Sequence, residues 1–488
     1  MTFLTLDIGS SSVRAILFDD TLKVIESSIV SRKYNFEVTA EGGSTVQADF
    51  LRGLVEASID DVLKHPEAAT IRAVGMDTFV GNLMGVDNHN KPITPIYTYA
   101  DTCSSDDVAQ LAKVVDADQN LQRTGCPLHT AYHPARLHWL RRTQPETFAA
   151  VKRWSDFGSF LYTAWFGQGA CSYSVASWSG MLNRQSLSWD AEWLKILGLE
   201  APHFPSLADF SDAHKGLTTE YAARWPLLRD VPFYLAVGDG AVANVGTGAA
   251  TADILAVTLG TTAAVRILVP SPHETPSVPK GLWSYRLDRT HHLIGGATSE
   301  GGNAFHWLQT LFPTLDFEHE QAAIMQRAAD SHGLTCLPLF NGERSPGWNS
   351  TAVGTLHGLR LSTTPTDILQ ATLEGVAMRI ALIAEQLPSV PHKIYVAGGA
   401  ATSSHLWVQM ICNALNRPVQ LVQAAEASAQ GVALMLAYAL DQKPLSNYTP
   451  PIAFSFTPHP ENVSRMKAAR ERQHDLYHRL YDRNLPRG

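Results

Sequence analysis

Two aspartates in this chain of 488 residues stand where a carboxylate could take part in proton transfer or metal binding. Asp239 lies between Gly238 and Gly240, directly after the apolar run 233–237, so its side chain would be unobstructed at a strand end. An Asp in such a place suits a general base that takes a proton from a substrate hydroxyl. A turn-forming or helix-capping Asp would leave the same pattern, so that structural reading stays open. Asp7 lies next to the end of the apolar segment 3–8. Its carboxylate could hold Mg²⁺ through water, or it could anchor the following turn by hydrogen bonds.

The segment that begins at Asp7 recurs in outline half a chain later. DIGSSSVRA (7–15) resembles LGTTAAVR (259–266). In each copy an apolar strand enters a glycine-hydroxyl turn and a second apolar strand follows, which predicts a β-hairpin whose tip offers N–H groups and hydroxyls to phosphate. The tip residues are Gly9, Ser10, Ser11 and Ser12 in one copy, and Gly260, Thr261 and Thr262 in the other. Single turns of this kind are common without any ligand, but two copies favour a duplicated plan with both tips on one polyphosphate.

Further permissive glycines stand at expected strand ends or helix starts, where a ligand can approach the backbone closely. They are Gly302 in SEGGN (299–303) and Gly398 and Gly399 in AGGA (397–400), which Ala400 and Ser403 follow. Neither G-x-x-x-x-G-K-[ST] nor G-x-G-x-x-G occurs, so a P-loop nucleotidase and a Rossmann dehydrogenase have no support from the sequence.

These residues need an α/β framework to position them. Short β-branched strands are expected at 3–8, 71–76 and 393–397, with helices at 50–64 and 404–415. The amphipathic segment 462–484 predicts a terminal helix packed on the body. Because the two hairpins suggest two similar halves, we place an N-terminal domain at 1–237, a C-terminal domain at 238–455 and the terminal helix in 456–488.

Composition narrows the class of protein. There are 38 Lys and Arg against 46 Asp and Glu, a formal net charge of −8, so no basic field exists to attract nucleic acid or an anionic membrane. Five scattered cysteines form no C-x-x-C pair, and the N-terminus has no basic leader. We expect a cytoplasmic enzyme that acts on a small molecule, with no nucleic-acid or membrane partner.

The assembled pattern resembles the FGGY family of carbohydrate kinases over nearly the whole chain. The family's C-terminal signature is matched by GTLHGL (354–359), seven further residues and DILQATLE (367–374). Its N-terminal signature is similar to HPARLHWL (133–140), with Arg136 where the family usually has Lys. The resemblance implies a hexokinase-like and actin-like ATPase fold, in which two ribonuclease H-like domains face each other across a cleft.

The resemblance also implies a role for each motif. Asp239 would be the catalytic base, Asp7 and Asp239 would lie at a Mg²⁺ site, and the hairpin tips would bind the phosphates of ATP. The nucleotide would be bordered by Gly302, Gly398, Gly399, Ala400 and Ser403. The sugar would be bound by residues of the N-terminal half, namely Asp77, Thr78, Phe79, Tyr99, Asp101 and Arg136.

The acceptor is expected to be a sugar or sugar acid. YTYAD (97–101) resembles the Thr-Trp-Ala-Asp stretch of the family's gluconate kinases more than the corresponding stretch of its pentulose kinases. Arg136 is the nearest cation by family position for a gluconate carboxylate, although it could equally be structural. A gluconokinase is therefore expected, with a pentulose or other polyol kinase as the alternative, and a non-catalytic sugar or nucleotide sensor as the alternative from another class. Members of the family are often dimers, so a homodimer is an expectation from the resemblance alone.

Overall fold

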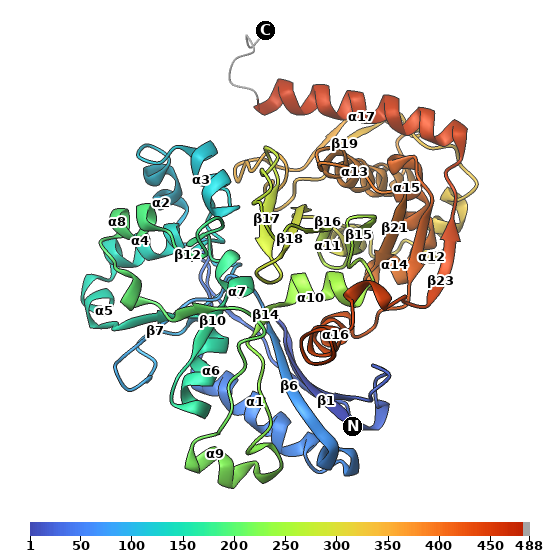
Figure 1. Cartoon of the computed structure of the whole chain (residues 1–488). Coiled ribbons are helices and arrows are strands. Elements are labelled where there is room, and N and C mark those ends of the chain that lie inside the picture. The colour runs from blue at the N-terminus through green and yellow to red at the C-terminus, as the bar shows by residue number, and fades with distance from the viewer. Residues whose placement is uncertain (482–488) are drawn as a thin grey trace.

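Each repeated motif forms a β-hairpin inside its own mixed sheet in the computed structural model, which describes residues 1–481 (Figure 1). The first hairpin joins β1 (Thr2–Ile8) to β2 (Ser12–Phe18), and the second joins β15 (Ile254–Leu259) to β16 (Ala263–Pro270). Both pairs are antiparallel, with Ile8 opposite Val13 and Leu259 opposite Ala263 next to the tips. The two hairpins expected from the sequence are confirmed.

The first sheet has the strand order β14-β6-β1-β2-β3. Its remaining strands are β3 (Val30–Lys33), β6 (Ile71–Thr78) and β14 (Val237–Gly238). β6 runs parallel to β1, and β14 runs parallel to β6, so three strands end at the same edge. Buried apolar residues of this sheet pack with those of α1 (Ala48–Val62) and α6 (Phe157–Phe166) in one core.

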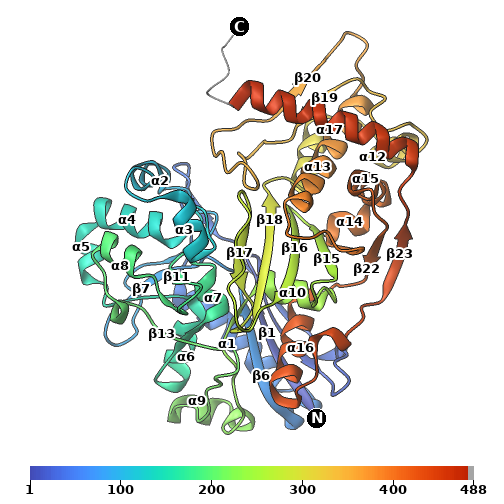
Figure 2. The ribbon, with the colours of Figure 1, turned by 45° about the horizontal axis from the view of Figure 1, so that its top comes forward.

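The second sheet has the order β17-β18-β16-β15-β21-β22-β23. Its other strands are β17 (Trp283–Arg286), β18 (His291–Thr298), β21 (Lys393–Ala397), β22 (Val419–Val422) and β23 (Ile452–Phe456). The helices α13 (Pro365–Glu385), α15 (His405–Leu415) and α17 (Pro460–Tyr481) share one apolar core with this sheet, and α17 lies across the top of α13 (Figure 2). A capping box between Thr364 and Asp367, the first residue of the DILQATLE motif, fixes the start of α13 at Pro365.

The two sheets repeat one pattern of pairings. The series β3-β2-β1-β6-β14 and β18-β16-β15-β21-β22 both contain two antiparallel pairings followed by two parallel ones. This duplication confirms the expected α/β class with two similar domains. Smaller elements between β6 and β14 form a lobe at the left of both views, namely α2 (Ser105–Leu111), α3 (Ala117–Thr124), α4 (His133–Thr143), α5 (Pro145–Ala150) and α8 (Ala191–Leu197).

Two helices, α10 (Asp239–Gly246) and α16 (Ala427–Asp441), lie between the sheets (Figure 1). They cross so closely that a Cβ on Gly246 would lie 1.8 Å from the carbonyl oxygen of Ala427, and one on Gly431 would lie 1.9 Å from that of Val242. Only glycine allows this approach, because any side chain there would overlap the backbone of the other helix. α10 begins at Asp239, so the crossing holds the candidate base in place.

The expected elements agree with the structure apart from shifts at their ends. The strand 393–397 matches β21 residue for residue, the helix expected at 404–415 is α15, and the helix expected at 50–64 is α1. The terminal helix begins at Pro460, and its expected last residues, 482–484, lie outside the described residues. Among residues 1–481, no helix is long and apolar enough to cross a membrane.

Candidate active site

Three carboxylates meet where β1, β6 and β14 end. Asp7 and Asp77 are register partners on the parallel strands β1 and β6. β14 continues the row, with Val237 opposite Asp77, and Asp239 follows directly as the first residue of α10. Parallel strands ending at one edge therefore bring together three residues that are far apart in the sequence.

Asp239 has the electrostatic properties of a general base. Partial burial raises the pKa of Asp239 to about 7, and the nearby Asp7 carboxylate adds to the rise. Three groups act in the opposite direction, namely the Gly240 N–H, which donates to Oδ1 over 2.7 Å, the Arg266 guanidinium and a backbone hydrogen bond from Val80. A carboxylate that titrates near neutral pH combines a large ionised fraction with useful basicity.

The surroundings of the other two carboxylates, Asp7 and Asp77, also disfavour their ionised forms. Burial raises the pKa of Asp77 well above its usual range, and the charges of Asp7 and Asp239 add to the effect. Burial likewise raises the pKa of Asp7, which Arg14 opposes from 4.0 Å. Within residues 1–481, no N–H or O–H group donates to either Asp77 oxygen, and the Thr78 hydroxyl beside it is also without a partner. Buried oxygens without donors are suited to a cation.

These oxygens fit Mg²⁺, which is usually held in kinases by one or two carboxylates together with phosphate oxygens and water. In the described part of the chain, no three His, Cys, Asp or Glu side chains are grouped closely enough to hold a metal ion by themselves. A Mg²⁺ site in which phosphate oxygens of the nucleotide complete the ligands is consistent with the unpartnered Asp77 oxygens and with the lack of a third protein ligand among the described residues.

Both hairpin tips are tightly closed. Gly9 N–H donates to the Ser12 carbonyl and Gly260 N–H to the Thr262 carbonyl, each over 3.0 Å. The Tyr34 hydroxyl donates to the Gly9 carbonyl over 2.5 Å and fixes the first tip from the side. The backbone at each tip is thus held in a defined conformation.

The expected nucleotide-binding glycines gather around the second tip. Gly302 N–H donates to the Gly260 carbonyl over 2.7 Å, at the start of α11 (Gly302–Leu311). Gly398 has a φ of +110°, and a Cβ there would lie 2.4 Å from the Leu259 carbonyl oxygen. A Cβ on Gly302 would lie 3.3 Å from that of Ala400. The same cluster includes α14 (Gly399–Ser403), where the Ser403 hydroxyl donates to the Gly399 carbonyl over 2.9 Å.

Tyr99 is an expected sugar-site residue whose side chain senses the charge of the base. Burial of its ring raises the pKa of Tyr99, and the Asp239 charge adds to the rise, while a hydrogen bond with Ser10 opposes it. The side chain is nevertheless 40% exposed, so it links the first hairpin tip to the space in front of Asp239.

Three other expected sugar-site residues are placed differently. Phe79 is fully buried in the N-terminal core, where its ring lies 5.3 Å from that of Phe36. Asp101 is buried and accepts the N–H groups of Ser44 and Cys103, which uses both of its oxygens within the loop.

Arg136 is the third of these residues, and its contacts differ most clearly from the expected role in sugar binding. It is 0% exposed, and its two terminal nitrogens donate to the carbonyls of Gly81, Thr98 and Thr130 over 2.6–3.2 Å. Three chain segments are tied together by this guanidinium, so it is committed to structure and is not open to a sugar carboxylate.

The structure adds residues that the sequence interpretation missed. The Trp178 indole stacks on Tyr285 with ring centroids 3.6 Å apart, and its Nε1 lies 2.7 Å from where a Cβ on Gly238 would be. The buried ring therefore packs against the backbone on both sides of Asp239, since its Cη2 lies 3.0 Å from where a Cβ on Gly240 would be. Arg266, on β16 of the second hairpin, also lies beside Asp239, with one terminal nitrogen 3.7 Å from where a Cβ on Gly240 would be.

Comparisons with known proteins agree with this geometry. The models of the FGGY family of carbohydrate kinases match the chain with the N-terminal domain at residues 2–246 and the C-terminal domain at 255–440. A gluconokinase of Bacillus subtilis (strain 168) is 26% identical over 454 residues, which cover 89% of this chain and 87% of the relative.

Solved structures show the same fold. A ligand-bound xylulose kinase from Lactobacillus acidophilus has a TM-score of 0.91 at 23% identity and covers 98% of both chains. A Plasmodium falciparum glycerol kinase with ADP has a TM-score of 0.84 at 17% identity and covers 97% of this chain and 98% of that one. The chain therefore belongs to the FGGY family of carbohydrate kinases, phosphotransferases that act on a sugar hydroxyl, and it has that family's two-domain α/β fold.

Proposed function

We propose that this kinase transfers the γ-phosphoryl group of ATP, bound with Mg²⁺, to a hydroxyl of a sugar acid, with D-gluconate as the specific acceptor. The observation that carries the proposal is Asp239, a carboxylate with a pKa of about 7 at the strand edge that also bears Asp7 and Asp77. A protein that only sensed the ligand would have no need of such a base.

The reaction assigns one task to each part of the site. An Asp239 oxygen accepts the proton of the acceptor hydroxyl as that oxygen attacks the γ-phosphorus and ADP leaves. Backbone N–H groups at the tips Gly9–Ser12 and Gly260–Thr262 donate to the phosphate oxygens, and Gly302 and Gly398–Ala400 give the nucleotide close access to the backbone. Asp7 and Asp239 would hold Mg²⁺, which would supply positive charge to offset that of the phosphates.

Two observations favour a sugar acid over a neutral sugar. The gluconokinases of two Bacillus species align over 89% of this chain at 26% identity, and the xylulose kinase of Lactococcus lactis aligns at 22%. The YTYAD stretch (97–101) resembles that of gluconate kinases. A pentulose such as D-xylulose is the second candidate, because the ligand-bound xylulose kinase has the same fold over nearly its whole length.

The proposal also includes the domain boundary, the cellular location and the oligomeric state. We place the domain boundary at residues 237/238, within the short strand β14 and just before the helix that begins at Asp239. A cytoplasmic location and a homodimer remain predictions.

The test is ADP release with ATP, Mg²⁺ and a panel of acceptors that includes D-gluconate, D-xylulose, L-ribulose and glycerol. We expect D-gluconate to stimulate ADP release far above the acceptor-free rate, and mass spectrometry to show one added phosphoryl group on the acid. Stimulation by D-xylulose alone would replace the acceptor and keep the kinase, whereas binding without turnover for every acceptor would indicate a sensor.

A further inference from the structure

The terminal helix α17 carries two histidines and two carboxylates on one face. Glu471, His474, Asp475 and His478 follow the spacing i, i+3, i+4 and i+7, which places side chains on the same side of an α-helix. All four line a pocket of about 800 Å³ that α13 and two loops of the C-terminal half also border. The described residues in its lining include none of those to which we assign a part in phosphoryl transfer.

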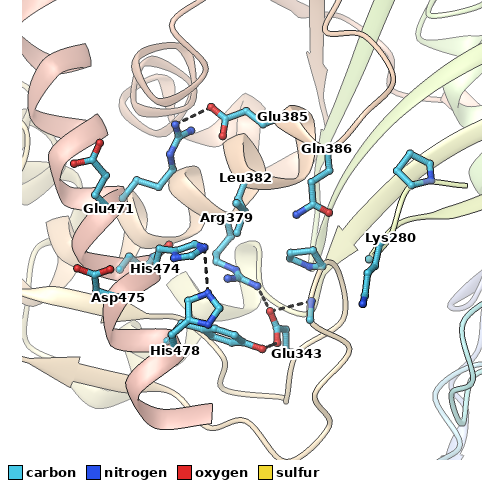
Figure 3. A pocket seen from close by; sticks show the side chains of 17 residues that line it. Lys280, Glu343, Arg379, Leu382, Glu385, Gln386, Glu471, His474, Asp475 and His478 are labelled. Carbon is cyan, nitrogen blue, oxygen red and sulfur yellow. Dashed lines mark hydrogen bonds and ion pairs between the residues drawn. The ribbon is translucent and has the colours of Figure 1, made fainter. Parts of the chain in front are cut away.

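The two histidines of this face meet across one turn of α17. The Nε2 atoms of His474 and His478 lie 3.2 Å apart, and the ring centroids lie 4.2 Å apart with an angle of 51° between the planes. Figure 3 shows the two rings turned toward each other. His474 is exposed and His478 is half-buried, so an ion from solvent can reach the pair.

The distance between the two Nε2 atoms fits chelation of one metal ion. Two imidazole nitrogens bound to Zn²⁺ at the tetrahedral angle lie about 3.3–3.4 Å apart, because each bond is about 2.0–2.1 Å long. Bonds of the same length at a right angle place the nitrogens about 2.8–3.0 Å apart. The 3.2 Å between His474 and His478 lies between these values. Both rings can therefore bind one ion with little movement of their side chains.

The same pair of atoms can also share a proton in a hydrogen bond. Which ring then donates depends on the tautomers of His474 and His478. A metal ion would take the place of the shared proton, since metal binding to imidazole requires a nitrogen without a proton. The hydrogen bond thus holds the rings in an arrangement that an ion can use.

The other charges of the pocket do not oppose a cation at this pair. Arg379 forms an ion pair with Glu343. Arg470 forms one with Glu385 over 2.7 Å. Lys280 is the remaining lysine or arginine in the lining, and the two exposed carboxylates that share the face of the histidines outweigh its charge.

The ligand set defines the class of ion. Imidazole nitrogens suit Zn²⁺, Ni²⁺ and Cu²⁺, whereas Mg²⁺ and Ca²⁺ prefer oxygen ligands. Within residues 1–481, no third His, Cys, Asp or Glu side chain completes a metal site. Water would therefore fill the remaining positions, and the ion would exchange with solvent more readily than in a closed structural site with four protein ligands.

We infer that His474 and His478 form a chelating site for one divalent transition-metal ion of the class of Zn²⁺, Ni²⁺ and Cu²⁺. The ion would connect two successive turns of α17 and favour the folded helix, because the two rings approach each other only when the helix is formed. The site does not depend on the proposed function, since neither histidine belongs to the strand edge that bears Asp239.

The turn between the two histidines also attaches α17 to a neighbouring loop. The Tyr477 hydroxyl donates to the Glu343 carboxylate, which also accepts the Gly347 N–H over 3.2 Å. Figure 3 shows Glu343 beside the histidines in the same pocket. An ion bound by the pair would therefore also stabilise the contact between α17 and the loop that carries Glu343.

The experiment measures Zn²⁺ binding by calorimetry on the full-length protein after removal of metals. Mg²⁺ is kept in excess so that sites made of oxygen ligands are filled. The variants are His474→Gln and His478→Gln. His319→Gln on α12 (Phe317–Ile324) is the matched control, because His319 is exposed and has no second histidine three or four residues away.

A double variant separates chelation from the mere presence of two histidines. His478→Gln combined with Arg479→His keeps the number of histidines on α17 but moves one ring away from the face of His474. Cu²⁺ in place of Zn²⁺ provides a second measurement, since its electron paramagnetic resonance spectrum reports how many nitrogen ligands the ion has.

We expect the wild type to bind one equivalent of Zn²⁺, with Cu²⁺ showing two nitrogen ligands. His474→Gln and His478→Gln should each raise the Kd for Zn²⁺ roughly 100-fold, because the second ring of a chelating pair acts at high effective concentration. The double variant should bind as weakly as the single ones. His319→Gln should bind Zn²⁺ like the wild type.

Two results would overturn the inference. One is an unchanged Kd for Zn²⁺ in both His474→Gln and His478→Gln, which would place the ion elsewhere. The other is equal affinity of the wild type and the double variant, which would exclude chelation across one turn. Acceptor-stimulated ADP release should be the same in His474→Gln as in the wild type. A wild type that phosphorylates no acceptor would contradict the proposed function and leave the metal site intact.

Discussion

Asp7 and Asp77 are register partners on adjacent parallel strands, so their carboxylates lie side by side at the edge where Asp239 begins α10. Burial raises the pKa of both carboxyl groups, and the charge of Asp7 adds to the rise at Asp77. The strands thus bring carboxylates together, and the nearest atoms of the Arg14 guanidinium and the Asp7 carboxylate are 4.0 Å apart. A cation and a phosphate tail can bind there together because each offsets the charge of the other.

The pKa of Asp239 predicts the pH dependence of the reaction. The charged groups near it are Asp7, Asp77 and Arg266, and its own charge acts on the Tyr34 and Tyr99 hydroxyls. A base must be ionised to accept a proton, so a pKa raised to about 7 means that activity is lost as the pH falls below neutrality.

We expect kcat/KM for D-gluconate to rise about tenfold per pH unit up to a midpoint near 7 and then to level off. The measurement runs from about pH 5.5 to 8.5 with Mg²⁺ in excess, which keeps the nucleotide as its magnesium complex. A flat profile over that range would mean that Asp239 titrates near the ordinary Asp value, contrary to the burial described above.

Arg136→Met should destabilise the protein without changing acceptor preference. The substitution leaves three buried carbonyl groups without their donor, at a cost of about 3–5 kcal/mol in the free energy of unfolding. Urea unfolding provides the measurement, and Arg141→Met on the exposed side of the same helix α4 is the control. A stable Arg136→Met protein that had lost its preference for D-gluconate over D-glucitol would restore Arg136 to the sugar site.

Gly431→Ala should destabilise the crossing of α10 and α16 by roughly 2 kcal/mol or more, because the added Cβ would meet the Val242 carbonyl at 1.9 Å. The matched control is Gly53→Ala on α1, where nothing lies within 4 Å of the added Cβ. That control should gain about 0.5–1 kcal/mol, since alanine is the better helix former. Equal free energies of unfolding for Gly431→Ala and Gly53→Ala would show that α10 and α16 can move apart at little cost.

Local chemistry explains which parts of the fold could be predicted from the sequence. The turns at Gly9 and Gly260 have a glycine followed by hydroxyl residues between apolar strands, and both hairpins formed as expected. The position of Asp239 at a strand end also followed from the apolar run before it. These features depend on short segments, so neighbouring residues carry the information.

The sugar site depended on long-range packing and was harder to predict. Phe79, Asp101 and Arg136 lie in the expected segments, but their side chains turn inward to a core or to carbonyl groups. Which side of a segment faces the ligand is decided by contacts between distant residues.

The central claim is that Asp239 takes the proton from the acceptor in a phosphoryl transfer. Acceptor-stimulated ADP release by Asp239→Asn, beside Asp253→Asn at an exposed position in the same half, tests it most directly. The account predicts that Asp239→Asn binds ATP and D-gluconate normally but loses stimulated turnover by about 10²–10⁴-fold, while the control keeps it. Near-normal turnover by Asp239→Asn, with binding intact, would contradict the account.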